Sequence, residues 1–215
     1  MALVSRKHNF IFVHIYRTGG NSVRKALGAP AVGSAIDILK ANEELGVHVN
    51  AKDLRQHYHN VGDDNFWETA YKFAVVRNPF SWLVSTYKYI VYSPGHNFNM
   101  MVKSMTYMQF LEWYVNTAMT MDRPFGSNKY STQYEFLYDD NGNRLVNYIG
   151  KVEQLGSALQ RISKITGVPL QNGIPAINKT NPNLPGWKSY YNKQSVDFVN
   201  KHFEKDLETF NYVWR

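Results

Sequence analysis

The chain alternates between short apolar runs and segments with helical spacing of apolar residues. Residues 9–15 and 71–76 are apolar without alternation, which is typical of strands buried on both faces of a parallel sheet. A helix is predicted after each run, the second one starting at Asn78-Pro79, where Asn is a good N-cap and proline fits the first turn. Other patterns predict a short strand at 147–150 and further helices at 35–45, 51–59, 105–119, 152–166 and 193–210. This order predicts an α/β fold, a three-layer domain in which helices flank a mainly parallel central sheet.

Length and composition are those of one globular domain. The chain has 215 residues, 44% of them hydrophobic, so a single domain over residues 1–215 with a buried core is expected. It contains no cysteine, which excludes disulfides, thiolate nucleophiles and cysteine-ligated metals. No stretch approaches the roughly 20 apolar residues of a membrane span, and the N-terminal segment lacks a signal-peptide pattern. We therefore expect a cytoplasmic protein with no membrane span.

The net charge of +7 favours an anionic partner. The 24 Lys and Arg residues are spread along the chain, and no run of them exceeds two. This spacing is not that of a basic arm or a recognition helix, so no nucleic-acid partner is expected. A phosphorylated cofactor or an acidic glycan fits the charge, and a merely soluble basic surface is the alternative.

The loop from Arg17 to Ser22, after the first predicted strand, suits an anion. Gly19 and Gly20 let the backbone approach a ligand and adopt positive φ. The helix that follows supplies N–H groups and the positive end of its dipole. Thr18 and Ser22 add hydroxyl donors, and Arg17 adds a fixed charge. Together these groups suit a phosphate or a sulfate, and the alternative is a tight strand-to-helix turn with no ligand.

The same loop departs from two common nucleotide-binding patterns. A Walker A loop has more residues between its glycines and a lysine where Asn21 stands, and the dinucleotide-binding motif has a different glycine spacing. ATP hydrolysis and dinucleotide binding are therefore disfavoured.

A second set of polar residues follows the second predicted strand. Arg77 comes directly after the strand, and Ser81 and Ser85 lie one turn apart on the next helix. An arginine at a strand end and a serine on the next helix can hold a second phosphate. An arginine that caps a strand end beside a solvated serine is the alternative. Because Arg17 and Arg77 each follow a predicted parallel strand, they are expected at the same edge of the sheet.

The two segments together resemble the sulfotransferase superfamily, in its carbohydrate-type branch (family 2-like). Residues 12–23, FVHIYRTGGNSV, resemble the 5′-phosphosulfate loop of that branch, roughly H-I-P-K-T-G-G-T-S. Residues 73–87, FAVVRNPFSWLVSTY, resemble its 3′-phosphate segment, V-R-[DN]-P-x-x-R-x-x-S-x-Y. Looser matches are found at 150–155, 178–180 and 203–212, so the resemblance covers most of the chain. Arg17 stands in place of the usual lysine, Tyr16 in place of proline and Asn21 in place of threonine.

The resemblance implies a P-loop-like sulfotransferase that binds PAPS (3′-phosphoadenosine 5′-phosphosulfate) and transfers its sulfuryl group to a hydroxyl by in-line displacement. The product of the donor would be 3′,5′-ADP. Arg17 would be the catalytic cation at the bridging oxygen, and the residues around the 5′-phosphate would be Arg17, Thr18, Gly19, Gly20, Asn21 and Ser22. Arg77 and Ser85 would bind the 3′-phosphate, and Lys179 and Thr180 would close over the nucleotide. No metal is required, because protein cations neutralise the developing charge.

The acceptor hydroxyl also needs a general base. The resemblance points to the segment after residue 45, where His48 is the predicted base, because an imidazole accepts a proton near neutral pH. An ordinary packed or surface histidine is the alternative. Glu43, Glu44 and Asp53 are other candidate bases.

The other histidines and the aromatic residues near the C-terminus have more ordinary interpretations. His57 and His59 compete with His48 for the role of base, and their spacing also suits a metal site, but no third ligand is evident. His14 falls within a predicted strand and is expected to be structural. Three aromatic residues could stack on a sugar or on adenine, or form a packed cluster: Trp187, Tyr190 and Tyr191.

The acceptor is predicted to be a carbohydrate, with a small molecule, a lipid and protein tyrosine left open. Acceptor loops are expected within residues 34–65 and 93–145. A non-catalytic nucleotide- or glycan-binding module on the same fold is the alternative function. A nucleotide-dependent kinase is less favoured, because neither Mg²⁺ ligands nor a P-loop lysine is visible. The sequence is silent on oligomeric state.

Overall fold

The computed structural model describes residues 2–28, 37–38, 48–120, 131–171 and 186–214. The chain forms two compact units, one made of Met1–Val76 with Arg123–Asn178 and the other of Arg77–Asp122 with Lys179–Arg215. The first unit contains the β-sheet, and the elements described in the second unit are all helical. None of the helices among the described residues is both long enough and apolar enough to cross a membrane.

The sheet of the first unit is mainly parallel, as the sequence predicts. Its order is β3-β1-β2-β4-β5, and its strands in chain order are Leu3–Ser5, Phe10–Val13, Asp37–Ile38, Tyr71–Val76 and Tyr148–Lys151. β2 pairs in parallel with β4, and β4 pairs in parallel with β5. β1 is antiparallel to both of its neighbours, so among the described strands it alone runs against the other four. The register places Val13 opposite Ala74, so the carboxyl ends of β2 and β4 lie at the same edge of the sheet.

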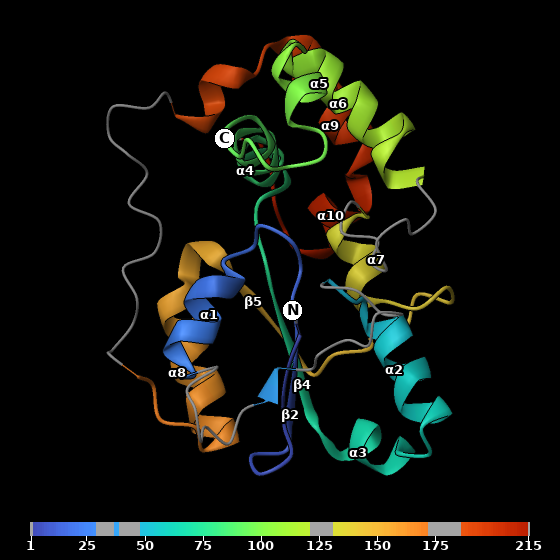
Figure 1. Ribbon diagram of the computed structural model, residues 1–215, viewed down its shortest axis with the longest axis vertical. Coiled ribbons are helices and arrows are strands. Elements are labelled where there is room, and N and C mark those ends of the chain that lie inside the picture. Colours follow the sequence, from blue (N-terminus) through green and yellow to red (C-terminus); the bar gives the residue numbers. More distant parts are fainter. Residues whose placement is uncertain (1, 29–36, 39–47, 121–130, 172–185, 215) are drawn as a thin grey trace. The chain divides into compact units, whose positions relative to one another are not determined.

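Helices cover both faces of this sheet (Figure 1). On one face Phe12 and Phe73 stack at 5.2 Å, and they belong to a core shared with α1 (Gly20–Ala26) and α8 (Leu155–Thr166). On the other side of the sheet lie α2 (Ala51–Asn60) and α3 (Asp64–Thr69). Every residue of β2 is fully buried, which explains why the strand reads as an unbroken apolar run rather than an alternating one.

The first unit differs from the sequence-based expectations at four places, one of which is the strand β1, which was not predicted. Asp37–Ile38 is a strand, β3, where a helix was expected over 35–45, because these residues pair with β1. The remaining residues of the range 35–45 lie outside the described part of the chain. α7 (Gln133–Leu137) and α3 were not predicted; α7 begins with a capping box between Thr132 and Glu135, a short-range signal that the sequence does contain. η2 (Val152–Gln154) leads into α8.

The second unit contains helices from two separate parts of the chain. Their bounds are α4 Pro79–Val91, α5 Asn99–Lys103, α6 Tyr107–Asn116, η1 Ala118–Thr120, η3 Trp187–Tyr190, α9 Lys193–His202 and α10 Glu204–Thr209. The start of α4 is as predicted: Asn78 is the N-cap, its side chain accepts a hydrogen bond from Phe80 N at 3.0 Å, and Pro79 is the first helical residue. The single helix expected over 193–210 is two helices, with the break at Phe203. Trp82 packs against Tyr114 and Phe203 in the interior of this unit.

Candidate active site

The loop after β2 has the strand-loop-helix form that the sequence predicts. β2 ends at Val13, and α1 begins at Gly20 with Gly19 as its N-cap. The hydroxyl of Thr18 donates a hydrogen bond to the carbonyl oxygen of Ile15 at 2.9 Å, and Thr18 is fully buried. The Thr18 side chain therefore braces the loop from within, which leaves its backbone N–H as the group suited to a ligand.

Arg17 has an unusual backbone conformation. Its φ is +61°, in the left-handed region, which costs a non-glycine residue about 1–2 kcal/mol relative to the right-handed region. Such strain persists only where the surrounding structure enforces it, and it is concentrated at functional sites. Arg17 is thus held in a conformation that fixes where its side chain leaves the loop.

Packing requires a glycine at position 20, and the backbone conformation favours one at position 19. A Cβ atom on Gly20 would lie 1.8 Å from His14 Nε2, and a Cβ atom on Gly19 would lie 3.3 Å from a methyl carbon of Val152. Gly19 also has a φ of +82°, which suits glycine. The imidazole of His14 therefore lies directly against the start of α1, a contact that only glycine permits at position 20.

His48 lies beside this loop. Its Nδ1 is 3.0 Å from the carbonyl oxygen of His14, and the His14 and His48 rings are 4.7 Å apart. The ring of Tyr16 also packs edge-on against His48, with the two ring centres 5.1 Å apart. All three side chains are buried. The structure thus brings the predicted base and the predicted anion loop together, although His48 lies 31 positions after Arg17 in sequence.

The hydrogen bond to His14 determines the chemistry available to His48. A carbonyl oxygen only accepts, so Nδ1 of His48 carries the hydrogen and donates it. A neutral His48 then has its lone pair on Nε2, and that nitrogen is the one able to accept a proton. His14, which the sequence analysis treated as a structural strand residue, is therefore part of the site, and no local pattern in the sequence indicated this.

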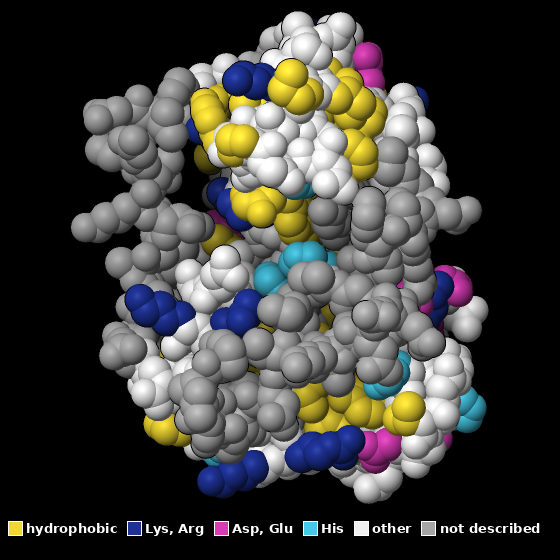
Figure 2. Space-filling view, in the orientation of Figure 1, with side chains coloured by type: hydrophobic (Ala, Val, Ile, Leu, Met, Phe, Trp, Pro, Cys, Tyr) yellow, Lys and Arg dark blue, Asp and Glu magenta, His cyan; other side chains and the backbone are white. Residues whose placement is uncertain are grey.

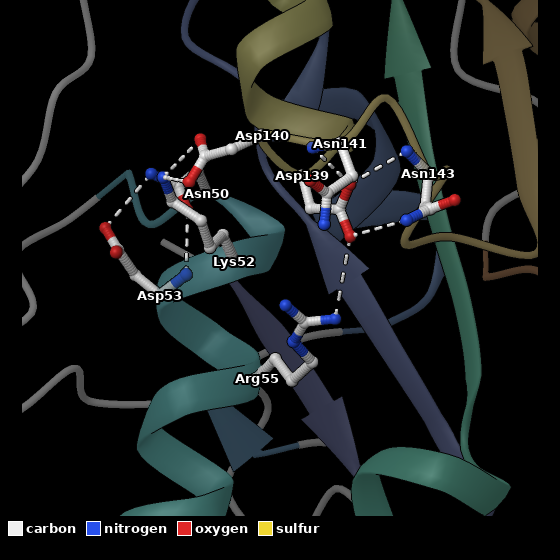
Figure 3. Close-up of polar contacts among 8 residues, drawn as sticks. All are labelled: Asn50, Lys52, Asp53, Arg55, Asp139, Asp140, Asn141 and Asn143. Atoms are coloured by element: carbon white, nitrogen blue, oxygen red, sulfur yellow. Dashed lines mark hydrogen bonds and ion pairs between the residues drawn. The ribbon is translucent and has the colours of Figure 1, made fainter.

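A network of polar contacts holds the segment that carries His48 (Figure 3). Asn50 caps α2 by accepting from Asp53 N at 2.8 Å, and its Nδ2 donates to Asp53 Oδ2 at 3.0 Å. Lys52 forms an ion pair with Asp140 at 2.9 Å. The Asp53 carboxylate thus takes part in capping α2. The other candidate bases, Glu43 and Glu44, lie outside the described residues.

The turn at 139–143 makes a further contact with α2. Asp139 accepts hydrogen bonds from the backbone N–H groups of Asn141 and Asn143, and Arg55 on α2 lies 4.0 Å from its carboxylate. The hydrogen bonds from Asn143 hold the pKa of Asp139 below its ordinary value. The carboxylate is therefore charged at neutral pH, as its contact with Arg55 requires.

In the second unit, Arg77 is tied to the first turn of α4. Its Nε donates to the Ser81 hydroxyl at 2.9 Å, and that hydroxyl donates to the carbonyl oxygen of Asn78 at 3.1 Å. This bond uses one of the five N–H donors of the guanidinium and fixes its orientation. Ser85 is half-buried one turn further along α4. Thus Ser81, which was not among the predicted binding residues, orients Arg77.

The remaining predicted donor-binding residues fall into two groups. Asn21 is exposed and Ser22 half-buried in the first turn of α1. Lys179 and Thr180 lie outside the described residues.

The aromatic residues after the Pro-rich loop form a packed cluster. The Tyr191 hydroxyl donates to the carbonyl oxygen of Phe80 at 2.9 Å and is 2.7 Å from the hydroxyl of Tyr107. Burial raises the pKa of Tyr107 well above its ordinary value. Trp187 lies 5.3 Å from Trp214, ring centre to ring centre. The ring of Trp187 also stacks on that of Phe80 at 6.5 Å, so Tyr191 and Trp187 both contact the first turn of α4, which favours the packing interpretation of this cluster.

The described part of the chain contains no group of three or more His, Asp or Glu side chains that could hold a metal ion. His59 instead contacts the carboxylate of Asp64 at 3.2 Å on the surface of α2 and α3. The ring of His57 packs edge-on against Tyr58.

Comparisons with known proteins identify the family of the chain and its fold. A model of the sulfotransferase family matches residues 1–213. Among solved structures, the crystal structure of mouse sulfotransferase SULT7A1 complexed with PAP aligns with a TM-score of 0.58 and 13% sequence identity, over 94% of this chain and 86% of that chain. A search of curated proteins finds no match. The structural likeness confirms the predicted α/β fold class.

Proposed function

Because this chain belongs to the sulfotransferase family, we propose that it transfers the sulfuryl group of PAPS to a carbohydrate hydroxyl by in-line displacement. The chain is a PAPS-dependent sulfotransferase, with PAPS as donor and 3′,5′-ADP as product. The observation that carries the proposed mechanism is the contact between His48 and the carbonyl oxygen of His14, because it joins a proton acceptor to the anion-binding loop.

The chemistry of the 14–22 loop fits a phosphosulfate group. The loop offers one permanent cation, Arg17, two glycines without side chains and the first turn of α1. When bound, PAPS supplies a sulfuryl group that is already activated by its attachment to a phosphate. We assign the 5′-phosphate contacts to Arg17, Thr18, Gly19, Gly20, Asn21 and Ser22.

Arg17 has the role of the catalytic cation. Negative charge grows on the bridging oxygen as the S–O bond breaks, and a cation already held in place stabilises that charge at no further cost of reorganisation. The left-handed backbone of Arg17 supplies such a fixed position. Removal of a single preorganised donor of this kind typically lowers the rate by about 10²–10³-fold.

His48 has the role of the general base. Its Nδ1–H donates to His14, and its Nε2 accepts the proton of the acceptor hydroxyl as the oxygen attacks sulfur. Asp53 is the weaker candidate because its carboxylate already accepts the hydrogen bond from Asn50.

The 3′-phosphate is assigned to Arg77 and Ser85 in the second unit. The bond from Arg77 to Ser81 holds the guanidinium in one orientation, and a guanidinium suits bidentate contact with a phosphate. Lys179 and Thr180 are proposed to close over the nucleotide. With binding residues in each of the two units, we propose that residues 1–215 work as a single sulfotransferase domain.

The carbohydrate acceptor rests on the resemblance of the two donor segments to the carbohydrate-type branch. The net charge of +7 is consistent with an acidic glycan. The cytoplasmic location stays a prediction from the sequence.

The donor site is tested by thermal stabilisation with 3′,5′-ADP, 5′-ADP and ATP. We expect a selective shift with 3′,5′-ADP, since a ligand at 100 times its Kd adds about 2.7 kcal/mol to the free energy of unfolding. Arg77→Ala should abolish this selectivity. Arg55→Ala removes a half-buried arginine that lies in neither donor segment, and it should keep the full shift. An equal shift with ATP would contradict the assigned 3′-phosphate site.

The mechanism and acceptor are tested by sulfuryl transfer from labelled PAPS to a panel of glycans and phenols. His48→Asn should lower transfer by about 10²–10⁴-fold and leave 3′,5′-ADP binding unchanged. His57→Asn, the matched change on α2, should leave transfer near the wild-type rate. Transfer to phenols and not to glycans would overturn the carbohydrate assignment and leave the sulfotransferase activity in place.

A further inference from the structure

The α4–α5 hairpin of the second unit carries a concentration of exposed apolar side chains. Seven large hydrophobic residues are exposed in the described part of the chain, and four of them lie between residues 89 and 101: Tyr89, Tyr92, Met100 and Met101. Met100 is 83% exposed and Tyr92 is 65% exposed. Single exposed apolar residues are ordinary, whereas a group of them marks an interaction surface. We call these four residues the hairpin patch.

The patch is supported by a tightly bonded turn. The buried side chain of Asn99, at the start of α5, donates to the carbonyl oxygens of Ile90 and Val91 at the end of α4, at 2.8 and 2.9 Å. His96 N donates to the carbonyl oxygen of Ser93 at 2.8 Å, and the rings of Tyr89 and His96 are 5.9 Å apart. The end of α4 and the start of α5 therefore hold the patch residues on one small, well-bonded support.

The hairpin itself and the adjoining element η3 are basic. No acidic residue occurs from residue 69 to residue 111, a stretch that includes Lys88 and Lys103. The adjoining element η3 adds Lys188, and the Lys88 ammonium lies 4.9 Å from the ring centre of Tyr190 in that element. Figure 2 shows hydrophobic side chains and Lys or Arg side chains next to one another over α4 and α5. The acidic residues of this unit's described part lie on other elements, at Glu112, Asp197, Glu204, Asp206 and Glu208.

From these observations we propose that the hairpin patch docks the enzyme on an anionic membrane surface. Tyr92 is suited to the headgroup layer, because tyrosine has an apolar ring and a polar tip, and Met100 is suited to the acyl boundary. Lys103 and Lys188 provide attraction to anionic headgroups. The contact is peripheral and reversible.

The charge and the exposure of the patch favour a membrane over a second copy of the chain. Two copies that met through this surface would bring like charges together. A side chain as exposed as Met100 stands clear of its own helix, and a lipid interface accepts such a side chain without a matching pocket. This inference goes beyond the proposed function and does not depend on the acceptor class.

The test is co-sedimentation of the full chain with phosphatidylcholine vesicles, with and without phosphatidylserine. We expect binding to the vesicles that contain phosphatidylserine, weakened by added salt because salt screens exposed charges. The double variant Tyr92→Ser with Met100→Ser should lower the partition coefficient by about tenfold or more, because it removes two buried apolar contacts with lipid. The matched control is Val61→Ser with Ile165→Ser, two exposed apolar residues outside the hairpin, and it should bind as wild type does.

Three results would overturn the proposal. They are no binding of the wild-type chain to phosphatidylserine vesicles, an equal loss of binding in both double variants, and a wild-type dimer that the hairpin variant breaks without any vesicle binding. Lys103→Glu gives a second readout, with loss of binding expected only for the anionic vesicles. Far-UV circular dichroism, measured on each variant, shows that the variant is folded. This check does not use 3′,5′-ADP, so a failure of the donor-site test leaves the vesicle test interpretable.

Discussion

At the scale of single residues, the candidate site contains one residue with a strained backbone and one close contact between a side chain and a glycine. Arg17 occupies the left-handed region, and His14 presses against the Cα of Gly20. The backbone of Arg17 carries a strain energy that glycine would relieve, and position 20 has no room for a side chain. Each therefore gives a test that separates the function of the residue from its contribution to stability.

Replacement of Arg17 should have opposite effects on stability and on activity. Arg17→Gly relieves the left-handed strain, so the free energy of unfolding should rise by about 0.5–1 kcal/mol, while sulfuryl transfer falls by about 10²–10³-fold because the cation is lost. Arg17→Lys keeps the charge and the strain, and it should retain most of the transfer rate. Denaturant unfolding and initial rates with labelled PAPS check both effects. Equal activity of the Gly and Lys variants would show that the Arg17 charge is not used.

Replacement of Gly20 should displace His14. The Cβ of Gly20→Ala would lie 1.8 Å from His14 Nε2, so the imidazole or the loop must move. Since His14 packs among Phe12 and His48, we expect a loss of about 1–3 kcal/mol in the free energy of unfolding, as for other overpacked sites, and weaker binding of 3′,5′-ADP. Gly62→Ala is the comparison, because nothing lies within 4 Å of a Cβ at that position, although its φ of +70° carries backbone strain. A Gly20→Ala protein with wild-type stability and binding would contradict this account of the loop.

At the scale of elements, the end of α3 and the start of β4 are held by a buried cation. Lys72 is buried, and its ammonium donates to the carbonyl oxygens of Trp67 and of Ala70, the latter at 3.0 Å. These carbonyls belong to the last turn of α3 and its C-cap, where a cation is favoured by the helix dipole. The pKa of Lys72 is lowered by burial, with Glu68 opposing the shift.

This lowered pKa predicts a pH dependence of stability. Between the folded-state pKa of Lys72 and its ordinary value of 10.5, the unfolded chain binds more protons than the folded chain. The contribution of Lys72 to the free energy of unfolding therefore rises with pH across that window. Lys72→Met should lack this rise, which urea unfolding of both proteins at a series of alkaline pH values would measure. Parallel curves for the two proteins would show that the Lys72 pKa is not lowered in the folded chain.

At the scale of the whole molecule, the family match spans both compact units, since it covers residues 1–213. The second unit is built from two stretches of chain, 77–122 and 179–215, and the chain returns to the first unit between them. Neither unit is therefore one continuous segment of the chain.

We expect the whole chain to unfold in one cooperative transition. Of the five tryptophans, only Trp67 belongs to the first unit, so Trp67→Phe leaves fluorescence that reports the second unit alone. In this variant the denaturant transition seen by fluorescence should coincide with that seen by far-UV circular dichroism, and 3′,5′-ADP should shift both equally. Two separate transitions would show that the single-domain interpretation is wrong.

The comparison of sequence and structure shows where local patterns suffice. The buried strands β2 and β4 were predictable because a strand covered on both faces must be apolar throughout. The start of α4 was predictable because Asn78 and Pro79 act within one helical turn. The two-residue strand β3 was not, because it exists only through its pairing with β1.

The sequence by itself determined the α/β class, the strand-loop-helix form around Gly19 and Gly20, and the family, since each depends on residues close together along the chain. Only the tertiary structure decided that His14 and His48 meet and that Gly20 is required by His14. The physical reason is that these contacts depend on packing between elements, and packing is not encoded in the spacing of any one segment.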